Sequence, residues 1–309
     1  MRWLGVDGGG TKTAFTVYDE RLVAADRLVL PTCHYAQAGI DGMRDVLAQG
    51  TAWAHDAGLL GAPYGIGYSI CGYGENAEAD AAIADTARDL ADGHPFALVN
   101  DVEAAWAAGL DMADGIALIA GTGSIALGVR GERRQRCGGW DYEIGDEGSG
   151  GWMGRELLRA FTRQADGRDE RGPLYDLVRE ELALADDFDI IAFAQAHIAD
   201  RTRIAALSQL VSRAAEAGDA SALGIFRRAA HEEADMVAAL VRSLFGDLAD
   251  TPGSVPVTYI GGTFRAGRLI LEPLAAALPS CCRLVAPAHE PDLGAVLILK
   301  DRLSSDPRL

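Results

Sequence analysis

The sequence predicts an α/β protein built of two related domains with a ligand-binding cleft between them. Two short turns rich in glycine and hydroxyl residues, 8–13 and 121–124, each join two apolar runs of strand character. Each turn stands at the head of a segment in which strand-like and helix-like patterns alternate. The chain has 309 residues, 49% of them hydrophobic, which is enough to form two hydrophobic cores.

The first alternating segment covers the N-terminal third of the chain. Short apolar runs bounded by turn residues predict strands, and apolar residues at helical spacing that end at a glycine predict helices. We expect, in chain order, strands at 3–6, 13–19 and 22–30, a helix at 42–58, a strand at 64–70, a helix at 77–91, a strand at 95–100 and a helix at 101–109.

The pattern then restarts with a second strand–turn–strand at 115–129. Residues 150–250 are expected to be largely helical with a loop at 165–173, and a strand at 256–262 and a helix at 290–303 follow. The charge runs RDER (168–171) and GERRQR (131–136) are expected to be exposed loops, and HEEAD (231–235) the solvated face of a helix.

Composition excludes several classes of protein. A net charge of −17 argues against a nucleic-acid or anionic-membrane surface, because it repels phosphates at long range. We find neither a run of 18 or more apolar residues nor the pattern of a signal peptide. The five cysteines are odd in number and lack paired metal spacing, which is typical of a reducing compartment. We therefore expect a cytoplasmic protein without nucleic-acid or membrane partners.

The chemistry that suits the two glycine turns is phosphate binding. Consecutive backbone N–H groups in a glycine-rich turn can surround an anion, and hydroxyl groups add hydrogen-bond donors. The candidates are Gly8, Gly9, Gly10, Thr11, Lys12 and Thr13 in the first turn, and Gly121, Thr122, Gly123 and Ser124 in the second. A hairpin turn without a ligand is the alternative for either turn alone.

Two well-known phosphate motifs do not fit these turns. The Walker A motif needs Gly directly before Lys, whereas Thr11 precedes Lys12 here. The segment 121–126 does match G-x-G-x-x-A of the dinucleotide fingerprint, but that fingerprint must open a helix. Here the following residues alternate like a strand, which argues against a dinucleotide site.

The strand–turn–strand with Asp7 ahead of its glycines, its repeat at AGTGS, and YIGGTFRAG together resemble the actin, hexokinase and Hsp70 superfamily of ATPases. More closely, the chain resembles the BadF/BadG/BcrA/BcrD-type group, which contains N-acetylglucosamine kinases and glucosamine kinases. The resemblance rests on GVDGGGTKT (5–13), NDVEAAW (100–106), IAGTGSIA (119–126), CGGWDYEIGDEGSGGWMGRE (137–156), YIGGTFRAG (259–267) and DLGAVLI (292–298).

This resemblance implies an α/β fold of two actin-like, ribonuclease-H-like domains with ATP and sugar in the cleft between them. The first domain would be residues 1–109, completed by the C-terminal helix 290–309. The second would be residues 110–289, with a helical insertion. It also implies a homodimer.

The resemblance further assigns roles to single residues. Asp101 would be the base that takes the proton of a sugar C6 hydroxyl, although an Asp at a helix start is also a common N-cap. Asp7 would organise Mg²⁺, with an Asp bonded to its own turn as the alternative. Gly261 and Gly262 would bind adenosine.

The sugar contacts that the resemblance implies lie in several segments. They are Asp101, Thr122, Gly139, Trp140, Asp146, Glu147 and His34, with core packing as the alternative for Trp140. Ile125 stands where animal N-acetylglucosamine kinases have Asn, so N-acetylglucosamine leads only narrowly over glucosamine, and N-acetylmuramic acid stays possible.

Three other functions fit the sequence less well. ATPase activators of 2-hydroxyacyl-CoA dehydratases carry a cysteine just ahead of the second turn, where this chain has ALIA (117–120). A sugar-sensing regulator would need a basic DNA-reading domain. A bare ATPase switch acting on a protein partner is opposed by the sugar-like central segment 137–156.

Overall fold

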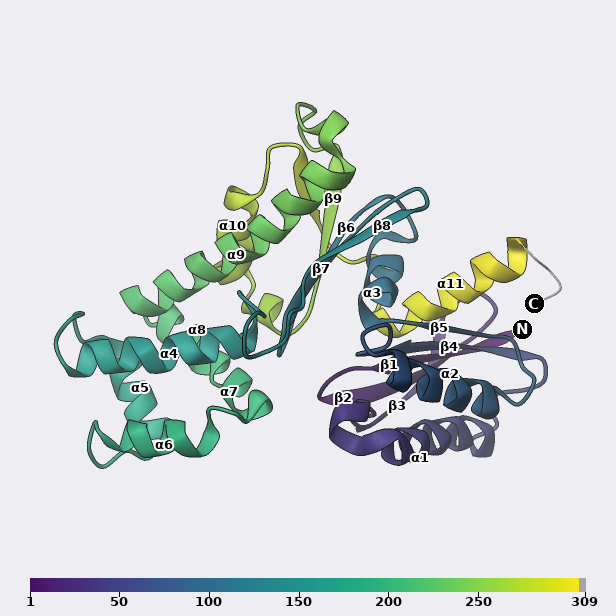
Figure 1. Ribbon diagram of the computed structural model, residues 1–309, viewed down its shortest axis with the longest axis horizontal. Helices are drawn as coiled ribbons and strands as arrows, with labels where there is room; N and C mark the ends of the chain where they lie inside the picture. The colour runs from purple at the N-terminus through teal and green to yellow at the C-terminus, as the bar shows by residue number, and fades with distance from the viewer. Residues whose placement is uncertain (306–309) are drawn as a thin grey trace. The chain divides into compact units, whose positions relative to one another are not determined.

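The computed structural model describes residues 1–305. They form two five-stranded sheets and the helices that pack on them (Figure 1). The chain divides into two compact units: Met1–Ala117 with the chain from Ala286 onward is unit 1, and Leu118–Val285 is unit 2. Our expected boundaries were 109/110 and 289/290. The observed division lies inside the strand that enters unit 2 and shortly before the last helix.

Unit 1 is a five-stranded sheet covered by helices on both faces (Figure 1). Its elements are β1 (Arg2–Gly8), β2 (Lys12–Tyr18), β3 (Ala24–Pro31), α1 (Tyr35–Asp56), β4 (Tyr64–Ile70), α2 (Ala77–Ala91), β5 (Phe96–Val99), α3 (Asp101–Leu110) and α11 (Pro291–Ser305). The strand order is β3-β2-β1-β4-β5, with β2 antiparallel to β1 and β3, and β4 parallel to β1 and β5. Helices α1 and α2 lie on one face, and α3 and α11 on the other.

Glycines let α11 pack with its backbone against α3 and the sheet. A Cβ on Gly294 would lie 1.9 Å from the carbonyl oxygen of Ala104 in α3. A Cβ on Gly67 of β4 would lie 2.4 Å from the backbone nitrogen of Val296. Because only glycine fits such contacts, the glycines of these segments hold the last helix against the first domain's strands.

Unit 2 repeats the same sheet plan. Its elements are β6 (Gly115–Ala120), through which the chain enters the unit, β7 (Ser124–Arg130), β8 (Arg133–Gly138), α4 (Gly150–Ala165), α5 (Pro173–Glu181), α6 (Asp189–His197), α7 (Arg201–Ala206), α8 (Ser208–Glu216), α9 (Ala220–Leu244), η1 (Gly246–Leu248), β9 (Val255–Ile260), η2 (Thr263–Ala266), α10 (Arg268–Ala277) and β10 (Cys282–Val285). The order β8-β7-β6-β9-β10 matches β3-β2-β1-β4-β5 strand for strand. The antiparallel β7/β8 and parallel β9/β10 pairs match β2/β3 and β4/β5. The predicted pair of related halves is thus confirmed.

The predicted helical character of residues 150–250 is also confirmed. The long helix α9 packs on β7 and β8, while α4 and α8 pack against α9 and carry the shorter helices α5 and α7 (Figure 1). Apolar side chains of α9, among them Ile225, Val237 and Leu240, are fully buried. A single amphipathic helix therefore joins the sheet to the helical segment.

The run 131–136, expected to be an exposed loop, is largely a strand. Residues Arg133–Gly138 form β8, which pairs with β7 at the edge of the sheet. Its first four side chains are exposed, as the charge predicted. Charged residues are typical of edge strands because they discourage pairing with another chain, and this makes such a strand look like a loop in sequence.

The solvated-face interpretation of HEEAD (231–235) is wrong for Glu233. That side chain is fully buried, and neither of its carboxylate oxygens has a hydrogen-bond partner. Burial raises the pKa of Glu233 well above its usual range, because a carboxylate loses its hydration in the interior. The cause is tertiary, because α9 is covered by the sheet on one side and by other segments of unit 2 elsewhere.

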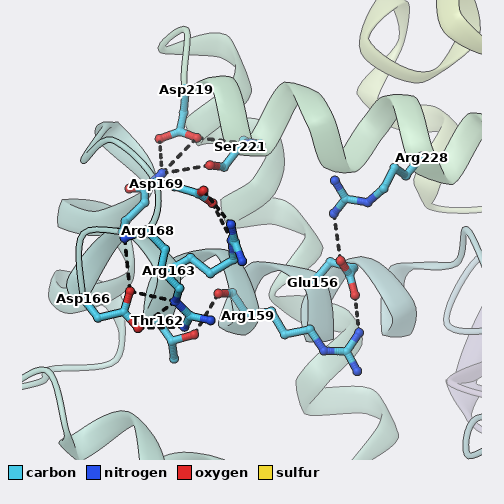
Figure 2. A network of polar contacts seen from close by, with 12 residues as sticks. Glu156, Arg159, Thr162, Arg163, Asp166, Arg168, Asp169, Asp219, Ser221 and Arg228 are labelled. Atoms are coloured by element: carbon cyan, nitrogen blue, oxygen red, sulfur yellow. Dashed lines mark hydrogen bonds and ion pairs between the residues drawn. The ribbon is translucent and has the colours of Figure 1, made fainter.

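Polar contacts join α4 to the loop 166–172 and to the start of α9 (Figure 2). Ion pairs such as Arg163–Asp169 lie on the surface of this region. Beneath them, the buried Asp219 carboxylate caps α9 by accepting from the Ala222 N–H at 2.9 Å. It also accepts from the Leu174 N–H at 3.0 Å and from Gln164 Nε2 at 3.1 Å. One carboxylate therefore links α4, α5 and α9.

Replacing Asp219 by Ala is expected to lower the free energy of unfolding by about 3–5 kcal/mol, since it removes a cap and leaves buried donors unpaired. The matched control is Asn76→Ala, which removes only the N-cap bonds of α2 and should cost about 1 kcal/mol. Urea denaturation of both variants measures the two losses. Equal losses would show that the contacts of Asp219 to α4 and α5 contribute nothing.

Candidate active site

The first glycine turn closes the β1–β2 hairpin. The Gly9 N–H donates to the Lys12 carbonyl at 3.1 Å. The carbonyls of Gly9 and Gly10 accept from Thr32 Oγ1 and Gln37 Nε2, each at 2.8 Å. A Cβ on Gly10 would meet nothing within 4 Å, so the space beside this residue is open. Neighbouring side chains thus fix the turn through hydrogen bonds, and the backbone at Gly10 has open space beside it.

Two residues of the predicted phosphate turn are occupied in packing. A Cβ on Gly8 would lie 2.6 Å from Cys33 Sγ, so Gly8 is required by its neighbours. The buried Thr13 hydroxyl donates to the Pro31 carbonyl at 3.0 Å and accepts from the Cys33 N–H at 2.9 Å. The hydroxyl of Thr13 therefore holds the end of β3.

The carboxyl ends of the parallel strands β1, β4 and β5 bring acidic residues together. Asp7 is paired in register with Ser69 of β4, and Ser69 with Val99 of β5. Asp101 lies two residues after the end of β5, and its charge raises the pKa of Asp7. This is the edge of an α/β sheet at which ligands usually bind.

Asp101 opens α3, but it is not the cap of that helix. The N-cap is Asn100, whose side-chain oxygen accepts from the Val102 N–H at 3.0 Å. Burial raises the pKa of Asp101 above its ordinary value, and a hydrogen bond from the Cys71 thiol counteracts part of this effect. The neighbouring charge of Glu75 raises the pKa of Asp101 further. The carboxyl group is therefore desolvated and has a raised pKa, as is common for carboxyl groups at functional sites.

Asp7 has a strongly perturbed carboxyl group. Burial, followed by the charges of Asp101 and Asp292, raises its pKa to about 7, while Arg27 and Lys12 act in the opposite direction. An ionised Asp7 thus lacks sufficient positive charge around it. A bound Mg²⁺ would supply that charge, and magnesium uses only one or two protein carboxylates together with phosphates and water. The side chain fits such an ion, although the described residues hold no group of three or more potential ligands.

Asp292 was part of the resemblance, but sequence reasoning gave it no role. Its carboxylate is buried at the start of α11 and accepts hydrogen bonds from Thr16 and from Tyr18, the latter at 2.6 Å. Arg27 lies 3.6 Å away. The residue both anchors α11 to β2 and adds negative charge near Asp7.

The predicted sugar contact His34 lies beside the loop that follows β4. His34 is the N-cap of α1, and its ring stacks on Tyr35 at 5.3 Å between centroids. A Cβ on Gly72 would lie 2.9 Å from Tyr35 and 3.3 Å from His34 Nε2. Since Cys71 bonds to Asp101, this loop connects His34 to the predicted base. Sequence reasoning missed Cys71 and Glu75. The available signal was the place of Cys71 directly after a buried strand, with Glu75 in the loop that follows.

In unit 2 the second glycine turn lies against the predicted adenosine segment. The turn joins β6 to β7, and the Gly121 N–H donates to the Gly123 carbonyl at 2.9 Å. Gly261 has φ +130°, and a Cβ there would lie 2.2 Å from the Ala120 carbonyl oxygen. A Cβ on Gly121 would have the Gly262 nitrogen as its nearest neighbour, at 4.0 Å. The second glycine turn and the segment Gly261–Gly262 therefore lie side by side in unit 2.

The loop between β8 and α4, residues 139–149, carries the predicted sugar contacts. Gly138 and Gly139 both have positive φ, and a Cβ on Gly139 would lie 2.8 Å from Ile125 Cδ1. Trp140 is 68% exposed, so core packing does not explain this side chain. Arg136 lies over the Trp140 ring at 5.7 Å. The loop thus has an exposed aromatic ring, Trp140, next to two glycines that have no side chain, Gly138 and Gly139.

The acidic pair at the end of the loop is tied to the second turn. The Asp146 carboxylate is only 3% exposed and accepts from the Ser124 N–H at 3.2 Å. Arg201 Nη2 pairs with it at 2.8 Å. Burial raises the pKa of Asp146, whereas Arg201 lowers it. The Glu147 carbonyl accepts from Ser124 Oγ at 2.6 Å, so the loop and the turn form one structure.

Comparison with solved structures defines the class of protein. The chain matches a ROK family glucokinase from Streptomyces griseus, solved with glucose and AMPPNP, at a TM-score of 0.59 and 18% identity over 98% of this chain and 99% of that one. It matches the structure of a candidate N-acetylglucosamine kinase from Chromobacterium violaceum at a TM-score of 0.75 and 26% identity over 96% and 98% of the two chains. The fold is that of the actin-like ATPases that include the ROK and related sugar kinases.

Sequence comparison narrows this class to a family. Residues 4–298 match the model of the BadF/BadG/BcrA/BcrD ATPase family, and the chain belongs to that family. It is 30% identical to the N-acetylmuramic acid/N-acetylglucosamine kinase of Clostridium acetobutylicum over 78% of this chain and 79% of that protein. It is 26% identical to the N-acetyl-D-glucosamine kinase of Dictyostelium discoideum over 96% and 97%. The predicted family is confirmed.

None of the helices formed by residues 1–305 combines the length and the apolar character needed to cross a membrane.

Proposed function

We propose that this protein is a kinase that transfers the γ-phosphoryl group of ATP to the C6 hydroxyl of an amino sugar. The observation that carries the proposal is the partly desolvated Asp101 at the carboxyl end of β5, beside a perturbed Asp7 and next to a glycine hairpin. The named activities of the relatives from Clostridium acetobutylicum and Dictyostelium discoideum support it.

Asp101 would act as the general base. Its carboxylate accepts the proton of the sugar hydroxyl as the hydroxyl oxygen attacks the γ-phosphorus and ADP leaves with the bridging oxygen. Burial raises the pKa of Asp101, which makes its carboxylate a stronger proton acceptor than a solvated one. The Cys71 thiol, bonded to Asp101, would orient the carboxyl group.

The phosphates of ATP would be held by backbone and hydroxyl groups of the two turns, Gly8–Thr13 and Gly121–Ser124. Lys12 adds a cation at the end of the first turn. Asp7 would hold Mg²⁺, which neutralises charge on the phosphates when bound. Gly261 and Gly262 would bind adenosine: Gly261 packs against the Ala120 carbonyl at the second turn, and the space beside Gly262 is open.

The amino sugar would contact the 139–149 loop, with Trp140 and Gly139 along its apolar face and Asp146 and Glu147 accepting from its hydroxyls. Thr122 of the second turn and His34 would add contacts. Ile125 packs against Gly139, so an apolar side chain lies beside this proposed site. N-acetylglucosamine leads glucosamine narrowly because both relatives named above act on it, and N-acetylmuramic acid is the third candidate.

The finer parts of the proposal are a Mg²⁺ requirement, a homodimer and a cytoplasmic location. All five cysteines are free thiols, which suits a reducing compartment. The Mg²⁺ requirement is supported by the raised pKa of Asp7, as argued above.

The test is ADP release from Mg-ATP with N-acetylglucosamine, glucosamine, N-acetylmuramic acid, glucose or no sugar. We expect one amino sugar to stimulate ADP release at least a hundredfold over the rate without sugar, because water is a poor substitute for a positioned hydroxyl. A slow rate that is equal in all five reactions would overturn the sugar-kinase proposal. Stimulation by glucose alone would overturn the choice of an amino sugar.

A further inference from the structure

Arg201, the first residue of α7, reaches two residues of the 139–149 loop. Its Nη1 lies 3.0 Å from Asp141 Oδ1, and its Nη2 lies 2.8 Å from Asp146 Oδ2. The two aspartates stand near opposite ends of the loop, so one guanidinium spans it. A planar, two-armed group suits this task, and a lysine could not reproduce it.

Both aspartates have strained backbone. Asp141 has φ +74° and Asp146 has φ +59°, a region that residues with a Cβ rarely adopt. Such conformations persist only where the surroundings enforce them, and they concentrate at functional sites. Here the enforcing contacts include the ion pairs to Arg201 and the hydrogen bond from the Gly145 N–H to the Asp141 carbonyl at 2.8 Å.

The Arg201–Asp146 ion pair also packs closely against the second glycine turn. A Cβ on Gly123 would lie 2.5 Å from Asp146 Oδ2 and 2.6 Å from Arg201 Nη2. A side chain at this position would displace the ion pair, so glycine lets the pair lie against the turn. Helix α7 is in turn fixed to α4, because a Cβ on Gly154 would lie 2.0 Å from the Ile204 carbonyl oxygen.

We propose that Arg201 is a positioning residue for the sugar: it pairs with Asp141 and Asp146 and so holds the Asp146 carboxyl group against the second glycine turn. The proposal rests on the proposed function, since it assumes that Asp146 accepts from sugar hydroxyls. It gives the helical segment of unit 2 a part in sugar binding.

The electrostatic surroundings of Asp146 agree with this role. The charged groups that act on it are Arg201 from α7 and Asp141 and Glu147 from its own loop. Burial, Asp141 and Glu147 all raise the pKa of Asp146, whereas Arg201 and the Ser124 N–H lower it. Loss of Arg201 would leave a buried carboxyl group beside two negative charges, and it would bind its proton more tightly.

The test compares Arg201→Gln, Arg201→Lys and the control Arg203→Gln with the wild type, using N-acetylglucosamine and Mg-ATP. Arg203 lies on the same helix, with its guanidinium 5.5 Å from the Phe193 ring centre. We expect Arg201→Gln to raise the sugar KM at least about tenfold, to leave the ATP KM within about twofold, and to move the acid limb of kcat/KM for sugar up by about one pH unit. Arg201→Lys should restore part of the sugar KM, and Arg203→Gln should match the wild type.

Hydrogen–deuterium exchange without ligands provides a second, independent measurement. Amides of residues 139–149 should exchange faster in Arg201→Gln than in the wild type, while those of β1 and β4 should be unchanged. An unchanged sugar KM, or an equal rise in the sugar and ATP KM values, would overturn the proposal. A wild type that no sugar stimulates would refute the proposed function instead, and exchange alone would then decide whether Arg201 holds the loop.

Discussion

Replacing Asp101 by Asn is expected to lower kcat by about a hundredfold to ten-thousandfold while leaving nucleotide affinity nearly unchanged. Asn is almost the same size as Asp and cannot accept a proton from the attacking hydroxyl. Since Asn100, and not Asp101, caps α3, the substitution does not remove the cap of that helix. Steady-state kinetics with the most active sugar of the panel, together with calorimetric titration of ADP, measure the two effects.

The matched control is Asp111→Asn at the other end of α3. Asp111 is an exposed C-cap residue in the left-handed conformation, which Asn also tolerates. It should retain the wild-type kcat. If Asp101→Asn kept most of its turnover, or lost nucleotide affinity as strongly as turnover, Asp101 would not be the base.

Replacing Asp7 by Asn is expected to have opposite effects on activity and on stability. Turnover should fall about a hundredfold or more, because the proposed magnesium ligand is lost. The free energy of unfolding at pH 8, without metal or nucleotide, should rise by on the order of 2–4 kcal/mol. The reason is that ionised Asp7 is unfavourable in the folded protein, where its pKa is raised to about 7.

The pH dependence gives the sign of this effect. The folded protein holds the Asp7 proton up to about pH 7, whereas an unfolded chain releases it near its ordinary value of 3.8. The contribution of Asp7 to stability is therefore complete below about pH 4 and is lost as the pH rises through 7. Asn cannot titrate, so the difference between variant and wild type should grow over this range and then stay constant.

Urea denaturation from pH 4 to pH 8 measures the difference, with Asp26→Asn on the exposed strand β3 as the control. Asp26→Asn should follow the wild-type curve. A stability difference for Asp7→Asn that does not change with pH would contradict the assigned pKa.

The sequence was most informative where a signal is local. Two glycine turns between apolar runs predicted both hairpins, and helix α2 begins and ends at the expected residues. Strand β8 was missed because the exposed charges that suit an edge strand also suit a loop. The cap of α3 could not be assigned, since Asn100 and Asp101 are equally good N-cap residues and stand side by side.

Much of the candidate site depends on contacts between distant parts of the chain. Arg201 meets Asp146 across 55 residues, and Asp292 meets Tyr18 across 274, so no sequence pattern near either residue announces the pair. Glu233 illustrates the same limit, because its helix face becomes buried only when the other segments of unit 2 pack against α9. The family resemblance supplied the motif, but only the fold shows which partners hold its carboxylates.

The return of the chain to unit 1 at its C-terminal end constrains how the protein can be made. Unit 2 is one continuous segment, Leu118–Val285. The ribosome must therefore synthesise all of unit 2 after Ala117 before it adds α11, the last helix of unit 1. At ordinary rates of synthesis this interval lasts about 10–30 s. During it, the faces of β1, β4 and α3 that α11 covers stay open, and Tyr18 has no carboxylate to bond. We infer that unit 1 stays incomplete during this interval. A chain shortened by α11 would therefore be a substrate for chaperones and proteases, not a weaker enzyme.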